Sequence, residues 1–433
     1  MRLSKKIIAG ALLLMGLPTM AQVTLTPQYM NRGEYRHGFQ KLADTNQNPA
    51  VFISQRARLT GEYKKEKYKI VIGAQDIRTW GSVANAALDT KGLLSISEAY
   101  GEVMPNKNIS VKFGRQILSY DDDRIIGSLD WAMQARRHDA AIFRYNDSTL
   151  TVHLGGAFNQ NQEQYNTTTY SVANNYKTFQ FLWANKVIGA ANVSFLFLNN
   201  GNQYNRVNTN GTTDSLTVFS QTAGLRGVYK KEKYSISGYG YYQMGKDASN
   251  KDLSAYDVSA EVTYNINKKF STTLGAELLS GTSQIDTANK VNHSFSPLYG
   301  TNHRFNGYMD YFYVGNHANS VGLLDGFFKV NYTHKNILLG LNLHAFYAAA
   351  DIRDKKNTTN LAAMSASLGN EIDFTLSYKI SDDVALQAGY SQILATDSMV
   401  ALKAGNKNET SNWAYLMVII RPGVKWPKTG LKM

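Results

Sequence analysis

The chain contains no cysteine, and only seven of its 433 residues are proline. The absence of cysteine excludes disulfide cross-links, thiolate zinc sites and cysteine nucleophiles. After the first 21 residues, no apolar run approaches the roughly 20 residues that a transmembrane helix needs. Aromatic residues make up 12% of the chain, and with 34 glycines and so little proline this composition favours long strands over helices.

The first 21 residues have the features of a secretory signal peptide. Three basic residues open the chain, residues 7–17 are apolar, and a small-residue cleavage site ends at Ala21. The alternative is an uncleaved anchor helix, but the apolar run is too short to cross a bilayer. We therefore expect an exported chain of 412 residues that begins at Gln22. The signal holds three of the 46 basic residues and none of the 33 acidic ones, which leaves the exported chain with a net charge of +10.

Polar breaks of two kinds alternate along the exported chain. Short breaks, typical of tight turns, lie at 64–67, 105–107, 146–147, 185–186, 230–232, 265–267, 334–336 and 381–383. Long breaks lie at 160–176, 199–215, 281–316 and 396–412. Short turns at one end and long loops at the other are the signature of outer-membrane barrels. We therefore predict an all-β fold, a transmembrane antiparallel up-and-down β-barrel of about 18 strands that forms one domain over residues 22–433.

Polar and apolar residues alternate between these breaks. Around Ser54, the even-numbered residues from 54 to 62 are polar or charged, whereas the odd-numbered ones include Ile53, Ala57 and Leu59. Soluble β-sandwiches alternate in the same way. The signal peptide, the asymmetry of turns and loops, and tyrosines at strand ends favour a barrel with an aromatic girdle at each membrane interface.

Residues 113–145 contain the most distinctive pattern in the sequence. They read as a strand (109–117), a charged loop and a returning strand (136–145), and they include GRQ-x-L-x-Y-x-x-x-R-x-x-G-S-x-x-W from Gly114 to Trp131. This pattern resembles the alginate export porins of Gram-negative outer membranes. Three other segments add to the resemblance: QDIRTWG at 75–81, SEAYGEV at 97–103 and FSPLYGTNHRFNGYMDYF at 295–312.

The resemblance implies a place in the cell outer membrane and a narrow, arginine-lined channel for an acidic polysaccharide. It also implies cooperation with a periplasmic secretion apparatus. The sequence departs from the family in one respect, because alginate exporters carry a long periplasmic loop that closes the pore near the carboxyl end. The corresponding break here is only Ser381-Asp382-Asp383. Gating by such a loop, and alginate itself as the solute, are therefore not expected.

Arginines and carboxylates recur at positions that strand alternation assigns to the lumen. Guanidinium groups offer paired donors to carboxylates, so rows of them could pass an acidic sugar chain along the pore. Alternatively, these charged side chains pair only with one another and stiffen a wet interior. The residues that we expect to line the pore or bind the solute are Arg32, Glu34, Arg36, Arg56, Arg58, Asp76, Arg78, Glu98, Glu102, Arg115, Arg124, Arg137, Asp139, Glu371 and Asp373.

Arg115 does not fit simple alternation, because it falls in line with Val111 and Phe113, which would face lipid. We expect Gly114 to mark a β-bulge that turns Arg115 towards the lumen. The alternative is that Arg115 extends along the lipid face to the outer interface.

No motif points to catalysis or to a metal. Residues 121–123 are three aspartates without the ligand spacing of a calcium loop, which favours a solvated outer loop over a calcium site. Glu371 and Asp373 lie two apart on one strand and cannot flank a sugar from opposite sides, as a glycosidase pair does. Serine-nucleophile motifs, metal-binding helices and phosphate loops do not occur. We expect no catalytic residue, no metal and no cofactor.

The favoured hypothesis is an outer-membrane pore for anionic solutes or an acidic polysaccharide, because fixed positive charge in a narrow lumen concentrates anions. A general anion-preferring nutrient porin, a surface-binding barrel with a closed lumen, and a barrel enzyme are the alternatives. The expected partners are outer-membrane lipid, the anionic solute and a periplasmic secretion apparatus, and no feature suggests nucleic acid.

Overall fold

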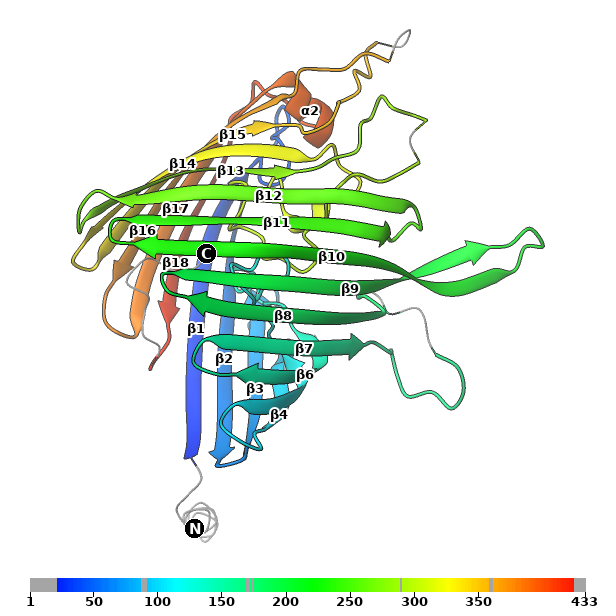
Figure 1. Ribbon diagram of the computed structural model, residues 1–433. Coiled ribbons are helices and arrows are strands. Elements are labelled where there is room, and N and C mark those ends of the chain that lie inside the picture. The colour runs from blue at the N-terminus through cyan, green and yellow to red at the C-terminus, as the bar shows by residue number, and fades with distance from the viewer. Residues whose placement is uncertain are drawn as a thin grey trace.

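The computed structural model describes residues 22–86, 92–168, 172, 174–288, 290–357 and 361–423. These residues form 18 strands in one sheet that closes on itself (Figure 1). Each strand pairs antiparallel with its neighbour in the chain, and β1 pairs with both β2 and β18. The predicted up-and-down barrel is therefore confirmed. The signal peptide predicted at residues 1–21 lies outside the described residues.

The strands are β1 (Gln22–His37), β2 (Ala50–Lys65), β3 (Tyr68–Thr79), β4 (Leu94–Val103), β5 (Ile109–Gln116), β6 (His138–Asn146), β7 (Leu150–Phe158), β8 (Thr178–Ile188), β9 (Ala191–Val207), β10 (Thr213–Lys231), β11 (Tyr234–Lys246), β12 (Asp252–Asn265), β13 (Phe270–Leu279), β14 (Leu323–His334), β15 (Ile337–Tyr347), β16 (Ser367–Lys379), β17 (Val384–Ala395) and β18 (Ser411–Ile420). In Figure 1 the near wall, β7–β13, runs across the far wall, β1–β3, because strands in a barrel are tilted.

Turns and loops separate to opposite ends of the barrel, as predicted. The short connections lie at 66–67, 104–108, 147–149, 189–190, 232–233, 266–269, 335–336 and 380–383. The longer connections include 38–49, 80–93, 159–177, 348–366 and 396–410. Two others matter most below, and we call them L3 (residues 117–137, between β5 and β6) and L7 (residues 280–322, between β13 and β14).

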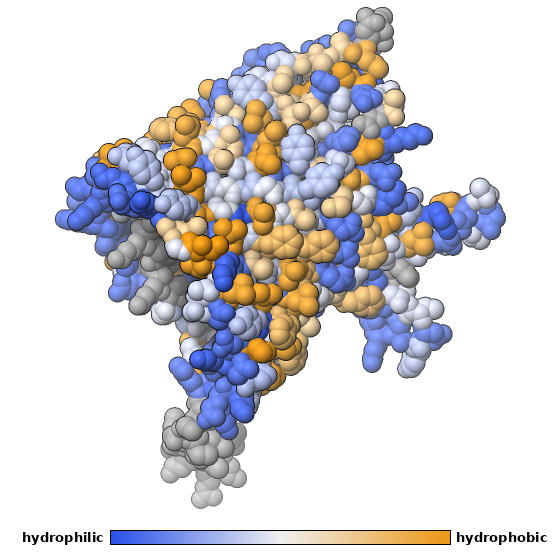
Figure 2. Space-filling model, viewed as in Figure 1, coloured by the Kyte–Doolittle hydropathy of each residue, from blue (hydrophilic) through white to orange (hydrophobic). Residues whose placement is uncertain are grey.

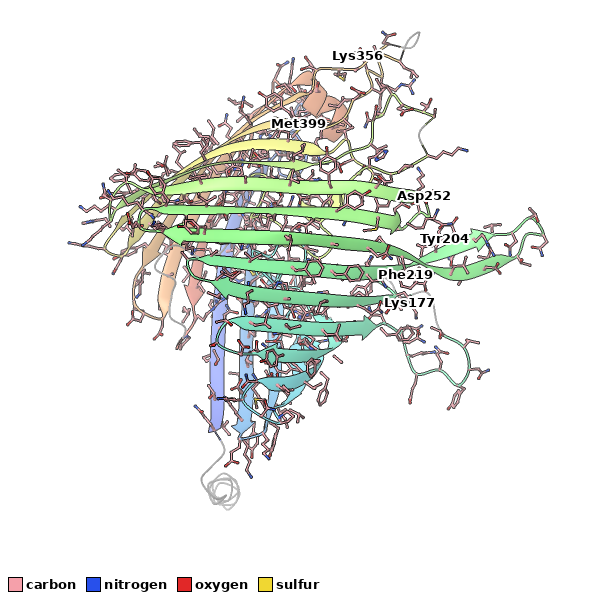
Figure 3. All side chains as sticks on the ribbon, in the orientation of Figure 1. Lys177, Tyr204, Phe219, Asp252, Lys356 and Met399 are labelled. Carbon is pink, nitrogen blue, oxygen red and sulfur yellow. The ribbon has the colours of Figure 1, made fainter. Side chains whose placement is uncertain are left out.

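Two predicted breaks are wrong. The turn predicted at Asn185 and Lys186 lies at 189–190, where Gly189 takes the left-handed backbone conformation that a tight turn needs. The long loop predicted at 199–215 is mostly strand, since β9 and β10 continue as a ribbon joined by 208–212. The ribbon projects beyond the barrel, with Tyr204 on it (Figure 3). Its Asn-, Gln- and Thr-rich residues resemble loop in composition but pair across the two strands.

The outer face of the barrel is apolar, as period-two alternation predicts. Leu154 is 56% exposed, whereas the preceding residue, His153, is 7% exposed and faces inward. Figure 2 shows apolar side chains gathered over the middle of the visible face and hydrophilic ones at the turns and the projecting loops. At the turn end, aromatic rings from neighbouring strands lie in contact, as Tyr234 does with Tyr264 at 4.9 Å between centroids. This arrangement fits the expected girdle.

L3 and L7 fold into the barrel and pack against each other. The amide of Tyr299 in L7 donates to the carbonyl of Ile125 in L3 at 3.0 Å, and the amide of Gly127 donates to the carbonyl of Tyr299 at 2.8 Å. The inward side chains of β18, including Trp413 and Met417, are buried beneath these loops. Because the loops replace water there, β18 is apolar on both faces.

The helices are short: α2 (Asp397–Lys403) and the 3-10 turn η1 (Val314–Asn316). Thr396 caps α2, since its hydroxyl accepts from the amide of Met399 at 3.3 Å. Over the described ranges, no helix is long and apolar enough to span a membrane.

Candidate functional site

Four inward arginines follow one another down β1 and β2, and we call them the basic row: Arg32, Arg36, Arg56 and Arg58. The β1–β2 register places Arg56 opposite Met30 and Arg58 opposite Gln28. Arg32, Arg56 and Arg58 therefore occupy successive levels along the wall, about two residues or 7 Å apart, and Arg36 lies four residues, or about 14 Å, beyond Arg32. The alternation of β1 and β2 was sufficient to predict that these four side chains face the interior.

The upper half of the basic row is tied to Glu34 and to aromatic rings. Arg32 donates to the Glu34 carboxylate at 2.9 Å and to the carbonyl of Trp131 in L3 at 2.8 Å. Its guanidinium lies 4.1 Å from the centroid of the Trp131 ring, and the residue is 5% exposed. Arg36 shares the Glu34 carboxylate at 2.8 Å and stacks over Phe39, but its side chain is 33% exposed. Arg32 is thus committed to L3, whereas Arg36 reaches water.

The lower half of the basic row is tied to L3 through Asp130. Arg56 is fully buried, with Nη2 3.0 Å from Asp130 Oδ1 and Nη1 donating to the carbonyl of Met133 at 3.1 Å. Arg58 donates to Gln75 Oε1 at 2.8 and 2.9 Å, lies 4.0 Å from Asp130, and is 10% exposed. Arg421, beyond β18, adds a third guanidinium 3.3 Å from Asp130. One L3 carboxylate therefore holds three cations of this wall.

Five inward carboxylates lie on a second stretch of wall, and we call them the acidic row: Asp257, Glu277, Asp325, Glu371 and Asp373, from β12, β13, β14 and β16. None is more than 3% exposed. The strand register sets Glu277 directly opposite Asp325, and His344 of β15 opposite Glu371, so the row lies at about one height.

Arg124 of L3 reaches into the acidic row. Its Nε lies 3.1 Å from Asp257 and its Nη2 2.7 Å from Glu277, with the residue 2% exposed. Burial opposes the charge of Arg124, but the carboxylates of Glu277 and Asp257 outweigh it and raise the pKa of Arg124 above its ordinary value. Asn306 of L7 donates to Glu277 at 2.6 Å and to Asp325 at 3.3 Å. L3 and L7 therefore share this wall.

The rest of the acidic row is held by His344 and by the backbone of L7. His344 Nδ1 lies 2.9 Å from Asp325, and Nε2 lies 3.8 Å from Asp373. The amide of Met309 in L7 donates to Glu371 at 2.8 Å. Glu371 and Asp373 thus face inward as predicted, but they support a loop.

Sequence reasoning missed four carboxylates of these clusters, Asp130, Asp257, Glu277 and Asp325. The last three could have been found, because each sits at an inward position of an alternating strand. Asp130 could not, because nothing local to the charged loop shows that it folds back onto β2.

Two predicted pore-lining residues, Asp76 and Arg78, lie instead on the outer face. Gln75 receives the Arg58 hydrogen bonds and so faces inward, which turns Asp76 and Arg78 outward with Ile70 and Ile72. The Arg78 guanidinium donates to Asp76 at 2.7 Å. Both residues lie near the loop end of β3, where charge on the outer face costs little.

Arg115 and Asp139 also face outward, contrary to expectation. They pair with each other at 2.8 Å, and their side chains are 44% and 52% exposed. Gly114 has a positive φ of 120°, yet the β5–β6 register continues through it without a bulge. Arg115 therefore lies on the outer face near the interface. Arg137 lies in L3 one residue before β6 and donates to the carbonyl of Gln134.

Glu98 and Glu102 on β4 face inward. Glu102 accepts from Ser110 at 2.8 Å and pairs with Lys69 at 3.2 Å and Arg144 at 3.1 Å. These contacts place a mixed cluster towards the turn end of the barrel.

The three aspartates at 121–123 do not form a solvated outer loop. They lie in L3 inside the barrel, where Asp122 pairs with Arg226 of β10 at 2.9 Å and Asp121 accepts from the Trp183 indole at 3.1 Å. Asp123 is 7% exposed. The side chains thus point to different partners. Within the described ranges, no group of three or more histidine and carboxylate side chains is arranged to hold a metal ion.

Cavities lined by described residues lie at both ends of the barrel and between them. The outer pocket, about 590 Å³, lies at the loop end. Its described lining includes Arg136, Arg137 and His138 and no carboxylate. The central pocket, about 510 Å³, borders the acidic row and is lined by more carboxylates than cations. The inner mouth, about 620 Å³, lies at the turn end. Its charged lining is Lys64, Glu66, Lys67, Lys69, Glu102, Lys107 and Arg144, five cations and two carboxylates.

Comparison with solved structures finds outer-membrane proteins of similar fold. Pseudomonas aeruginosa OccK9 (OpdG) matches with a TM-score of 0.61 and 11% identity, over 92% of this chain and 98% of that chain. Acinetobacter baumannii OccAB1 matches with a TM-score of 0.60 and 14% identity, over 92% and 97%. Pseudomonas aeruginosa OccK2 (OpdF), solved in complex with glucuronate, matches with a TM-score of 0.58 and 10% identity, over 92% and 98%. Identities this low establish the fold alone.

A comparison with curated proteins found no match. The family model described as alginate export, in contrast, matches residues 22–410, which include all of the strands except β18. With the closed barrel of 18 described strands, this match shows that the chain belongs to the alginate export family of outer-membrane β-barrel porins.

Proposed function

We propose that this barrel is a passive or facilitated channel for anionic solutes, with acidic sugars as the preferred class. The observation that carries the proposal is the excess of cations in the cavities at both ends of the barrel. Among the described residues, the lining of the outer pocket includes no carboxylate, and that of the inner mouth has five cations against two carboxylates. Fixed positive charge between low-dielectric walls raises the local concentration of anions.

The basic row supports the same proposal. Arg36 and Arg58 keep part of their side chains accessible, at 33% and 10% exposure, while Arg32 and Arg56 hold L3. A carboxylate solute can therefore meet the first pair and not the second. That OccK2, a protein of the same fold, was solved with glucuronate agrees with an acidic sugar as solute.

The proposal includes no enzymatic activity, because the carboxylates that could act as acid and base support loops. It also places any periplasmic secretion partner at the turn end, beside the inner mouth. The connection between β16 and β17 is only 380–383, which supports passage without a long periplasmic gating loop.

The test is ion selectivity of the purified barrel in planar bilayers. Replacing Arg36 and Arg58 together by glutamine should lower the anion-to-cation permeability ratio, read from reversal potentials in a salt gradient. The effect should shrink at about 1 M salt, where the Debye length is about 3 Å. Arg206→Gln is the matched control, because Arg206 lies on the projecting ribbon with 54% side-chain exposure. Unchanged reversal potentials in the double variant would refute an anion channel that uses the basic row.

A second measurement separates the acidic-sugar channel from a general anion porin. Glucuronate added to one side should interrupt the single-channel current of an acidic-sugar channel. A general porin would show the same anion preference without such interruptions.

A further inference from the structure

One six-residue pattern occurs twice at the turn end of the barrel. Tyr-Lys-Lys-Glu-Lys-Tyr spans residues 63–68, between β2 and β3, and again residues 229–234, between β10 and β11. We call these two segments the lysine hairpins. They lie eight strands apart in one direction around the ring of 18 strands and ten in the other. In Figure 1, β10 and β11 belong to the near wall, whereas β2 and β3 belong to the far wall. The two lysine hairpins therefore lie nearly across the barrel from each other.

The strand register gives both lysine hairpins the same arrangement of side chains. In the first hairpin, Tyr63 pairs with Ile70, and Lys65 pairs with Tyr68. The second hairpin repeats both pairs, as Tyr229 with Ile236 and Lys231 with Tyr234. Because paired residues point to the same face of a sheet, one lysine of each hairpin lies beside a tyrosine on one face.

Alternation shows that this face is the outer one. Lys64 lines the inner mouth, so Lys65, the next residue, points away from the lumen. Arg226 of β10 faces inward to L3, which turns Lys230 inward and Lys231 outward. Each hairpin thus divides its lysines between the lumen and the lipid face.

The outward lysines differ from a paired lysine of the same end. Lys69 is held by Glu102 at 3.2 Å. Lys65 and Lys231 are exposed, and we find no ion pair of either one within the described residues. Each is followed in the sequence by a glutamate, which therefore does not neutralise it. The outer face keeps two cations that are available to an anion outside the protein.

The rings beside these lysines mark the level of the lipid headgroups. Tyr63 and Tyr68 lie 6.0 Å apart between centroids, and Tyr234 lies 4.9 Å from Tyr264 of β12. Tyrosines on the outer face of a barrel concentrate at the membrane interface. The isoleucine of each hairpin lies further from the turn, towards the bilayer core. Each hairpin therefore presents, from the core outwards, an apolar side chain, aromatic rings and a cation, which is the order of acyl chain, glycerol and phosphate in a phospholipid.

We propose that each lysine hairpin binds one anionic phospholipid, such as phosphatidylglycerol, in the periplasmic leaflet at the turn end. The ammonium group of Lys65 or Lys231 pairs with the phosphate, the neighbouring tyrosine contacts the glycerol, and the isoleucine contacts an acyl chain. A zwitterionic lipid has an ammonium group of its own, which repels the lysine and weakens the pairing. This inference concerns the lipid face and goes beyond the proposed function. Two such contacts on nearly opposite walls hold the barrel at one depth in the membrane.

Native mass spectrometry of the purified barrel, titrated with phosphatidylglycerol in detergent, counts the bound lipids and measures their affinity. We expect two molecules that bind more tightly than the rest. Lys65→Gln and Lys231→Gln should each weaken the binding of one of them about fivefold, which is the usual contribution of one cation near anionic headgroups. Lys64→Gln and Lys230→Gln are the matched controls, because each removes the same charge from the inward face of the same hairpin. The controls should leave both affinities unchanged.

Four results would overturn the inference. Unchanged affinity in the variant that combines Lys65→Gln with Lys231→Gln would show that these lysines bind no lipid. Equal losses in Lys64→Gln and Lys65→Gln would assign binding to the total charge of the hairpin and not to its outer face. Equal affinity for phosphatidylcholine would remove the anionic class. Displacement of the lipid by inorganic phosphate would assign the lysines to a free anion. None of these outcomes depends on ion selectivity, so the anion channel is tested separately.

Discussion

The basic row and the acidic row are both held by L3, but they differ in their access to water. On the basic wall, Asp130 is 39% exposed and Arg36 is 33% exposed at the side chain. On the acidic wall, no carboxylate is more than 3% exposed, and their cation, Arg124, is 2% exposed. A charge near water can be hydrated when its partner is lost, whereas a buried one cannot. Similar ion pairs should therefore have unequal energetic importance in the two walls.

Five carboxylates crowd the acidic wall, against Arg124 and His344. The basic wall has the reverse composition, with three arginines around Asp130. L3 supplies Arg124 to one wall and Asp130 to the other, only six residues apart in the chain. The comparison shows that one loop can balance two opposite charge excesses if it spans the lumen.

The largest effect is expected from Arg124→Met. It leaves Asp257 and Glu277 buried without their cation, which should lower the free energy of unfolding by about 3–5 kcal/mol. Urea unfolding of the barrel in lipid vesicles measures this, and protease cleavage within L3 reports release of the loop. Arg206→Met is the control, because its pair with Asp214 is exposed and should contribute about 0–1 kcal/mol. Equal losses in the two variants would contradict the buried role of Arg124.

Asp130→Asn should lower the free energy of unfolding by a smaller amount. The arginines that lose their carboxylate are partly hydrated or have other acceptors, so we expect about 1–2 kcal/mol in the same unfolding experiment. The anion-to-cation permeability ratio should rise, because three guanidinium groups are no longer neutralised. If the ratio falls, Asp130 does not compensate the basic row.

Glu371→Gln should leave the free energy of unfolding within about 1 kcal/mol of that of the parent. Glutamine keeps an acceptor for the Met309 amide and removes one of two neighbouring buried charges. Glu371→Ala removes the acceptor and should lower the free energy of unfolding by about 1–3 kcal/mol. The same loss in both variants would show that the charge of Glu371, and not its acceptor, holds L7.

The smallest effect is expected from Arg115→Gln. Its ion pair with Asp139 is exposed on the outer face, so stability should change by about 0–1 kcal/mol. Reversal potentials should not move at all, since the charge lies outside the lumen. A shift in selectivity would place Arg115 on the inner wall after all and restore the bulge at Gly114.

The sequence predicted which side chains face inward where polar and apolar residues alternate strictly. The prediction failed where consecutive apolar residues interrupt the alternation. Around Arg56 the polar and apolar residues alternate strictly, and the inward side followed directly. In β3, the consecutive residues Ile70, Val71 and Ile72 hide the period, and the charges of Asp76 and Arg78 suggested the wrong face. Near the outer membrane interface, charged residues are tolerated on both the lipid face and the lumen face of a strand. Their charge therefore does not indicate which face they occupy.

The contacts of L3 were beyond prediction for a different reason. Arg124 meets Asp257 across 133 residues of sequence, and Arg421 meets Asp130 across 291. The pattern of neighbouring residues in the sequence contains no information on such pairs, because they form only when the barrel closes. Alternation predicted a water-filled lumen. Part of that lumen is instead filled by L3 and L7, and Trp413 is fully buried beneath them.

The span of L3 also has a consequence for the order of assembly. L3 is complete at residue 137, but its partners extend from Arg32 through Glu277 to Arg421, so it finds them all only when the last strand is in place. Contacts this distant in sequence form late, because closing the intervening chain costs entropy first. L3 therefore takes its final packed position inside the lumen only after the barrel has closed. Its resistance to protease should consequently appear as the final step of insertion and mark the finished molecule.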